Sequence, residues 1–134
     1  MLTGGCHCGA IRYEADAEPI IHVLCHCTDC QRASGAPMVG WVVVNDQDLV
    51  LTGEPAIYAS SLEAKRYFCI QCGTGLFFSH SGRAPGKVDI QAATLDDPGA
   101  VAPVAHIHVA ERISWMDGAE KLPHYPGWSG LDAE

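Results

Sequence analysis

The chain has 134 residues, 48% of them hydrophobic, and it carries 14 glycines and 8 prolines. This length suits one domain with its own core over residues 1–134, and the composition is that of a turn-rich globular protein. The formal net charge of −8 argues against a nucleic-acid partner held by broad electrostatic attraction. No stretch approaches the ~20 apolar residues of a membrane span, and the first residues lack the basic start and apolar run of a signal peptide. We therefore expect a cytoplasmic protein with no membrane partner.

Short segments that alternate apolar and polar residues, or that are rich in β-branched residues, predict a mainly β fold. We expect about nine strands, at 10–15, 20–24, 38–44, 48–52, 56–59, 66–68, 76–78, 87–93 and 104–109. The run at 38–44 is continuously apolar and is interpreted as a central strand. From Trp115 onward, Gly and Pro at positions 118, 123, 126, 127 and 130 predict an irregular, wrapped tail.

Seven cysteines dominate the sequence. An odd number cannot all pair within one chain, and a reducing cytosol disfavours disulfides, so metal binding is the better interpretation. The cysteines fall into three clusters: Cys6 and Cys8; Cys25, Cys27 and Cys30; Cys69 and Cys72.

The middle cluster has the spacing of a metal site. The strand at 20–24 would deliver Cys25 and Cys27, and one helical turn would place Cys30 beside them. Thr28 and Gln31 fit a capping box that opens this turn, while Gly35 and Pro37 supply its end. Amides at the start of a helix favour thiolates. Three thiolates leave a tetrahedral Zn²⁺ one ligand short, which is the condition of a catalytic zinc.

The remaining cysteines can form a closed site. Cys69-x-x-Cys72-Gly73 is typical of a zinc knuckle at the tip of a hairpin, and with Cys6 and Cys8 it would complete a four-sulfur site. Spacing alone also allows a second division, in which Cys27, Cys30, Cys69 and Cys72 share one metal and Cys6, Cys8 and Cys25 are left over. The first division is preferred because it keeps the close pairs and the triplet together.

A resemblance to a known family rests on three motifs: Gly5-Cys6-His7-Cys8-Gly9, the run from Cys25 through Gln31-Arg32 to Ser34-Gly35, and Cys69-x-x-Cys72-Gly73-Thr74. They resemble the glutathione-dependent formaldehyde-activating enzyme family, which has an Mss4-like, β-tent fold. The match continues through Leu95-Asp96-Asp97-Pro98, His106-Ile107 and Trp115, and covers roughly residues 3 to 125.

The resemblance implies two Zn²⁺ per chain. A structural zinc would lie on Cys6, Cys8, Cys69 and Cys72, and a catalytic zinc on Cys25, Cys27 and Cys30. The implied activity is that of a carbon–sulfur lyase that joins glutathione, or a similar thiol, to formaldehyde as S-hydroxymethylglutathione. A thiol carrier without turnover and a purely structural zinc protein are the alternatives, and the oligomeric state is open between a monomer and a homodimer.

Three residues after the middle cluster are candidates for substrate binding: Arg32, Ser34 and Gly35. Arg32 could meet a substrate carboxylate, although an ion pair with Asp29 three residues earlier competes with that role. Ser34 and Gly35 could expose donors or only end the helix. A fourth ligand from His26 would make the middle cluster a second structural site, but a side chain between two ligands should point away from their metal. No histidine is predicted to be catalytic.

Overall fold

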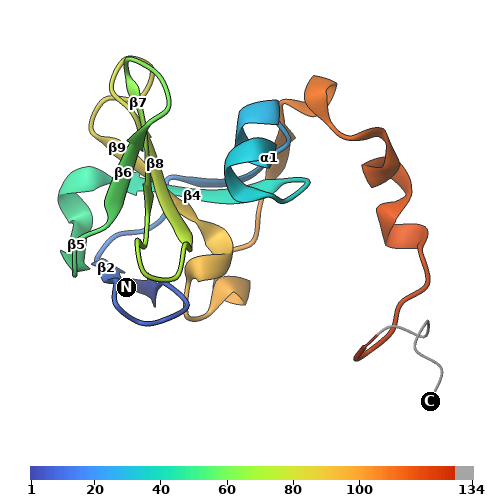
Figure 1. The fold of residues 1–134 in the computed structure, drawn as a ribbon, viewed down its shortest axis with the longest axis horizontal. Coiled ribbons are helices and arrows are strands. Elements are labelled where there is room, and N and C mark those ends of the chain that lie inside the picture. The colour runs from blue at the N-terminus through green and yellow to red at the C-terminus, as the bar shows by residue number, and fades with distance from the viewer. Residues whose placement is uncertain (129–134) are drawn as a thin grey trace.

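The computed structural model describes residues 1–128, in which ten strands form two sheets (Figure 1). The smaller sheet is antiparallel and contains β1 (Leu2–Gly5), β2 (Arg12–Ala15) and β5 (Leu49–Thr52). The larger sheet has the order β10-β3-β4-β9-β8-β7-β6, and only its edge pair β10–β3 is parallel. Its strands are β3 (Ile21–Cys25), β4 (Val39–Asn45), β6 (Ala56–Ala59), β7 (Ala64–Phe68), β8 (Gly75–His80), β9 (Lys87–Gln91) and β10 (Ala105–Ile107). The predicted mainly β, tent-like architecture is confirmed.

Both faces of the larger sheet are covered at β4, as its continuously apolar sequence predicts. Val42 and Val44 are fully buried on the face toward the smaller sheet, in the main core with Tyr13, Leu76 and Ile90. Trp41 belongs to a second, smaller cluster, in which it packs with cysteines and with valines of β3 and β4. The main core holds the two sheets together, and the second cluster adjoins the site described below.

Only one α-helix occurs in residues 1–128, α1 (Thr28–Ser34), and it follows β3 directly. Five short 3₁₀ helices connect or follow the strands: Asp46–Asp48, Ala92–Thr94, Pro98–Ala100, Val109–Glu111 and Ser114–Lys121. None of the helices in this part of the chain has the length and apolar character needed to cross a membrane.

The sequence patterns missed the first strand, β1. Its glycines look like a loop, but Gly4 lets the strand pass close to a buried aromatic ring. A Cβ at Gly4 would lie 2.3 Å from the Tyr13 hydroxyl oxygen. The strand therefore pairs with β2 across Tyr13 only because position 4 has no side chain.

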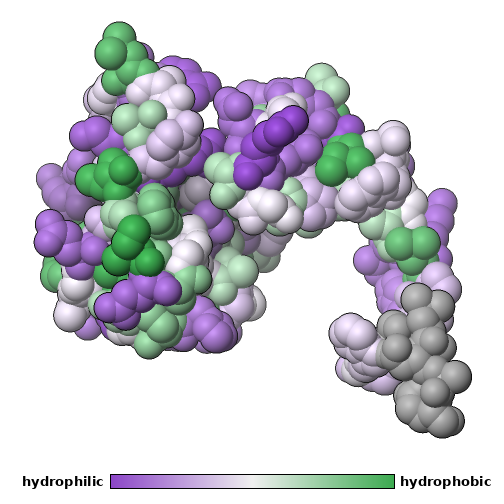
Figure 2. Space-filling model, in the orientation of Figure 1, coloured by the Kyte–Doolittle hydropathy of each residue, from purple (hydrophilic) through white to green (hydrophobic). Residues whose placement is uncertain are grey.

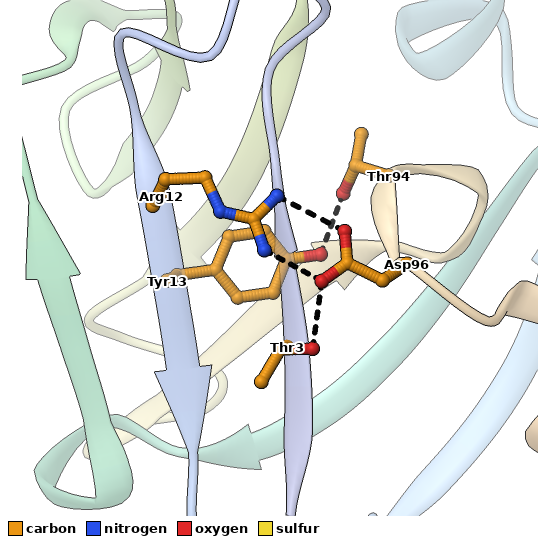
Figure 3. Close-up of polar contacts among 5 residues, drawn as sticks. All are labelled: Thr3, Arg12, Tyr13, Thr94 and Asp96. Atoms are coloured by element: carbon orange, nitrogen blue, oxygen red, sulfur yellow. Dashed lines mark hydrogen bonds and ion pairs between the residues drawn. The ribbon is translucent and has the colours of Figure 1, made fainter.

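A polar network joins the smaller sheet to the segment after β9 (Figure 3). The Tyr13 hydroxyl lies 2.8 Å from Thr94 Oγ1, and Thr3 Oγ1 donates to Asp96 at 2.7 Å. Arg12 completes the network with a two-pronged ion pair to the same carboxylate, Nη1 to Oδ1 at 3.0 Å. These contacts hold β1 and β2 against residues that lie more than 80 positions later in the chain.

The prediction that the tail wraps around the body is wrong. After β10 the chain leads away from the two sheets (Figure 1), and hydrophobic residues are scattered along it (Figure 2). Trp115 is 60% exposed and Trp128 is 80% exposed. The prolines and glycines of this segment interrupt regular secondary structure, as expected. They do not provide apolar contacts that would hold the segment against the sheets. Gly130, part of the same prediction, lies outside the described residues.

Candidate metal centres

Two turns bring four cysteines together. Cys6 and Cys8 lie between β1 and β2, and Cys69 and Cys72 lie between β7 and β8. Their four sulfur atoms all lie within 4.8 Å of one another, with 3.6 Å between Cys6 and Cys8 and 3.8 Å between Cys8 and Cys69. A tetrahedral ion with zinc–sulfur bonds of about 2.3 Å would hold its sulfurs about 3.8 Å apart. The geometry therefore fits a closed four-sulfur metal site.

Backbone contacts shape both turns. The amide of Ile11 donates to Cys6 Sγ at 3.2 Å, as amides do around thiolate ligands. In the second turn, Gly73 has a φ of 79°, and its amide donates to the carbonyl of Cys69 at 2.8 Å. Glycine adopts this left-handed conformation without strain, which explains why it follows Cys72.

The other three cysteines come from one short stretch. Cys25 ends β3, Cys27 is the N-cap of α1, and Cys30 lies inside the helix. Their sulfur atoms also lie within 4.8 Å of one another. The structure thus groups the sulfurs as four and three in the preferred division, and Cys27 and Cys30 do not join Cys69 and Cys72.

The predicted capping box at Thr28 is wrong. The N-cap is Cys27, whose sulfur accepts the amide of Cys30 at 3.2 Å. Gln31 does not reach back to Thr28, because its Nε2 donates to the carbonyls of His26 at 2.7 Å and Glu111 at 3.1 Å. The amide of Thr28 donates instead to Glu111 Oε1 at 2.9 Å. A sulfur in the capping position keeps Cys27 next to Cys30.

The end of the helix agrees with the prediction. Gly35 is the C-cap, with a φ of 69°, and its amide donates to the carbonyl of Gln31 at 2.8 Å. Ser34 Oγ donates to the carbonyl of Cys30 at 2.7 Å and accepts the amide of Ala36 at 3.2 Å. Both residues therefore serve the helix terminus.

Charge in the three-sulfur group concentrates on Cys30. The neighbouring thiol of Cys25, the indole N–H of Trp41 and the Arg66 side chain lower the pKa of Cys30 to about 5. The Trp41 contact measures 3.4 Å from Nε1 to Sγ. The pKa of Cys25 is raised in turn, first by Cys30 and then by burial. Three converging sulfurs, one of them readily ionised, suit a soft divalent cation such as zinc, which would favour the thiolate form of all three.

A cavity of about 660 Å³ opens beside this group, and all three of its cysteines line it. Trp41 and Phe78, with ring centroids 6.0 Å apart, form an apolar part of the wall. The cavity is also lined by three arginines and three acidic residues: Arg32, Arg66, Arg83, Asp29, Asp89 and Glu111. Its volume lies within the range of about 300–1,000 Å³ that is usual for small-molecule sites.

Of the three candidate substrate residues, only Arg32 lines the cavity. Its predicted ion pair with Asp29 is not found among the residues that the structure describes. Ser34 and Gly35 do not line the cavity. Sequence patterns did not single out Arg66, Arg83 or Asp89, because these residues lie on different strands and loops and carry no motif.

The buried histidines have structural partners. His26 is fully buried between Cys25 and Cys27 but lies outside the cysteine group, with its Nε2 2.8 Å from His106 Nδ1. His22 Nδ1 lies 2.8 Å from the carbonyl of Val101. His26 therefore points toward a neighbouring histidine and not into the sulfur group, as predicted.

Three known proteins are similar to this chain. An uncharacterized lyase of Schizosaccharomyces pombe is 32% identical over 83 residues, which are 61% of each chain, so this chain spans less than two thirds of that relative. A protein of Halomonas elongata, provisionally named a glutathione-dependent formaldehyde-activating enzyme, is 26% identical over 87% of this chain and 80% of its own. A solved structure of a Rhodobacter sphaeroides protein shares the fold, with a TM-score of 0.62 and 24% identity over 78% of this chain and 98% of its own.

The family comparison covers the sheets and both cysteine groups. The sequence profile of glutathione-dependent formaldehyde-activating enzymes matches residues 1–111, which extend from β1 to the 3₁₀ helix that contacts α1. The chain therefore belongs to the glutathione-dependent formaldehyde-activating enzyme family.

Proposed function

We propose that this protein is a zinc-dependent carbon–sulfur lyase that works in the adduct-forming direction. It joins glutathione, or a similar thiol, to formaldehyde and yields S-hydroxymethylglutathione. The observation that carries the proposal is the three-sulfur group at the wall of a cavity, because three ligands leave a tetrahedral zinc with one open position. Membership of the family and the names of the relatives support the same chemistry.

The proposal assigns the cysteines two roles. Cys6, Cys8, Cys69 and Cys72 hold a structural Zn²⁺, and Cys25, Cys27 and Cys30 hold a catalytic one. When bound there, zinc supplies a coordination position for a thiol and lowers its pKa. Cysteines that serve as zinc ligands and form no disulfides suit the reducing cytosol, which we propose as the compartment.

The protein's own residues would bind and orient the two reactants. Arg32 presents a positive charge at the cavity for a carboxylate group of the thiol substrate, while Trp41 and Phe78 exclude water from one wall. Holding thiol and aldehyde together in this space raises the rate mainly through proximity, since thiols add to formaldehyde readily without a catalyst.

Cobalt substitution tests the proposal directly. Protein loaded with Co²⁺ should change its thiolate-to-metal charge-transfer band when glutathione is added, because a fourth sulfur enters the three-sulfur site. Magnetisation-exchange NMR on the zinc protein should show faster interconversion of glutathione and its formaldehyde adduct than in protein-free solution. A changed band without faster exchange would favour a thiol carrier. An unchanged charge-transfer band at millimolar glutathione would reject both the lyase and the thiol carrier, and would leave only a structural role for the metals.

A further inference from the structure

Side chains from four adjacent strands form one row along the cavity. Tyr58 on β6 is opposite Arg66 on β7, Arg66 is opposite Phe78 on β8, and Phe78 is opposite Asp89 on β9. Directly paired residues point to the same face of a sheet. All four residues line the cavity, so the row lies along its sheet side, within the space that the three-sulfur group also faces.

Asp89 is the unusual member of this row. It is half-buried, and its carboxylate has no hydrogen bond or ion pair among residues 1–128. Burial, with a further contribution from Cys30, raises the pKa of Asp89 to about 6, so the group is mainly ionised at pH 7.5. A half-buried charge without a partner loses part of its hydration, and a carboxylate facing a cavity can be compensated by a cationic group of a ligand.

Two further arginines, Arg66 and Arg83, line the same cavity as Asp89. The Arg66 guanidinium stacks on Phe78, 4.8 Å from the ring centroid, and acts on Cys30, so it is already engaged. Arg83 also lines the cavity and is close enough to oppose the rise in the pKa of Asp89. Its guanidinium makes no ion pair with any residue that the structure describes. An unpaired carboxylate and an unpaired guanidinium therefore face one space.

We infer that Asp89 and Arg83 form a subsite for a zwitterionic α-amino-acid group, with Asp89 accepting the ammonium and Arg83 donating to the carboxylate. This inference rests on the proposed function, because the thiol would carry that group. It makes the protein selective for thiols with a free α-amino group, such as glutathione, over thiols of the same size in which that nitrogen is acylated.

Two ligands and three variants test the subsite. Binding of glutathione and of glutathione acetylated on its amino group is measured at pH 7.5 through the Co²⁺ charge-transfer band. Asp89→Asn should weaken glutathione about 10- to 100-fold, as expected for loss of a charge-assisted hydrogen bond, and should not weaken the acetylated ligand. Asp89→Ala should likewise weaken binding of glutathione and not of the acetylated ligand, and it replaces Asp89→Asn in the test if that variant does not fold. Arg83→Gln should weaken both ligands equally, because both keep the carboxylate.

Asp29→Asn is the matched control, because it removes the same charge from an exposed position on the same cavity. The ratio of the two affinities should change less than about threefold in this variant, since exposed charges are screened. Equal weakening of both ligands by Asp89→Asn, or an equal change of the ratio by Asp29→Asn, would overturn the Asp89 contact. No effect of Arg83→Gln would overturn the carboxylate contact. If neither thiol alters the band in the unchanged protein, the proposed function itself fails, and the subsite with it.

Discussion

Single residues in the cavity show a conflict between binding and stability, and Asp89 is the clearest case. This half-buried carboxylate in the middle of a sheet loses part of its hydration, and no residue within positions 1–128 compensates it by a hydrogen bond or ion pair. Asp96, by contrast, lies at the surface and has Arg12 and Thr3 as partners, which hold the pKa of Asp96 down at about 2. The folded protein therefore favours ionisation of Asp96 and opposes that of Asp89.

Asp89→Asn should stabilise the protein at pH 8 by about 1–2 kcal/mol. A pKa raised from 3.8 to about 6 corresponds to about 3 kcal/mol of stability lost when the Asp89 carboxylate is ionised. The half-buried amide of asparagine would also lose part of its hydration, so the substitution recovers only part of this free energy. Because the folded state binds this proton more tightly than the unfolded chain, stability falls as pH rises from about 4 to about 6. The gain should therefore be full above pH 7 and about half as large at pH 5. Urea unfolding of both proteins at pH 8 and pH 5 measures this gain in stability. A loss of stability in Asp89→Asn at pH 8 would contradict the expected cost of ionising Asp89.

At the scale of elements, α1 depends on its two ends more than on its length. It has only seven residues, too few to be stable alone, and buries only Cys30. Its start is held by the Cys27 sulfur and by Glu111, and its end by Gly35 in the left-handed conformation. The geometry of the three-sulfur group therefore depends on both caps.

Gly35→Ala should destabilise the protein by about 1 kcal/mol. A Cβ at position 35 would meet no atom within 4 Å, so the cost comes from the left-handed backbone alone. Gly35→Asn should cost less, because asparagine tolerates this conformation better. Thermal or urea unfolding compares the two variants. Equal losses for Ala and Asn would mean that backbone strain is not the cause.

At the scale of the whole molecule, the two cysteine groups differ in what they connect. The four-sulfur group joins the β1–β2 turn to the β7–β8 turn, and these turns belong to different sheets and lie more than 60 residues apart. The three-sulfur group spans six consecutive positions at one end of the larger sheet. A cross-link that closes a long loop restricts the unfolded chain more than one that closes a short loop.

Cys69→Ser should therefore unfold the protein or lower its melting temperature strongly, since a structural zinc contributes about 10 kcal/mol or more of apparent binding energy. Cys27→Ser should leave the sheets folded and lose only the metal at the cavity. Melting curves together with zinc content per chain measure both effects. Equal losses of stability in the two variants would remove the distinction between a structural and a catalytic site.

The sequence by itself determined the local features of this protein. Cysteine spacing over a few residues predicted the close pairs and the triplet, patterns of alternating, β-branched and apolar residues predicted nine of the ten strands, and Gly35 predicted the end of the helix, because each depends on backbone conformation nearby. The sequence patterns missed β1 because its glycines look like a loop. Gly4 is needed there for close contact with Tyr13, which lies in another strand.

Only the tertiary structure decided which distant residues share the cavity. Asp89 and Arg66 carry no motif, and they meet because β7, β8 and β9 pair in one register. At the start of α1, the partner of the Thr28 amide was likewise decided by the fold, because Glu111 lies more than 80 positions later in the chain. Strand order and register are properties of long-range packing, which local patterns do not encode. The three cysteine clusters could therefore be found in the sequence, while the residues on the sheet side of the cavity required the fold.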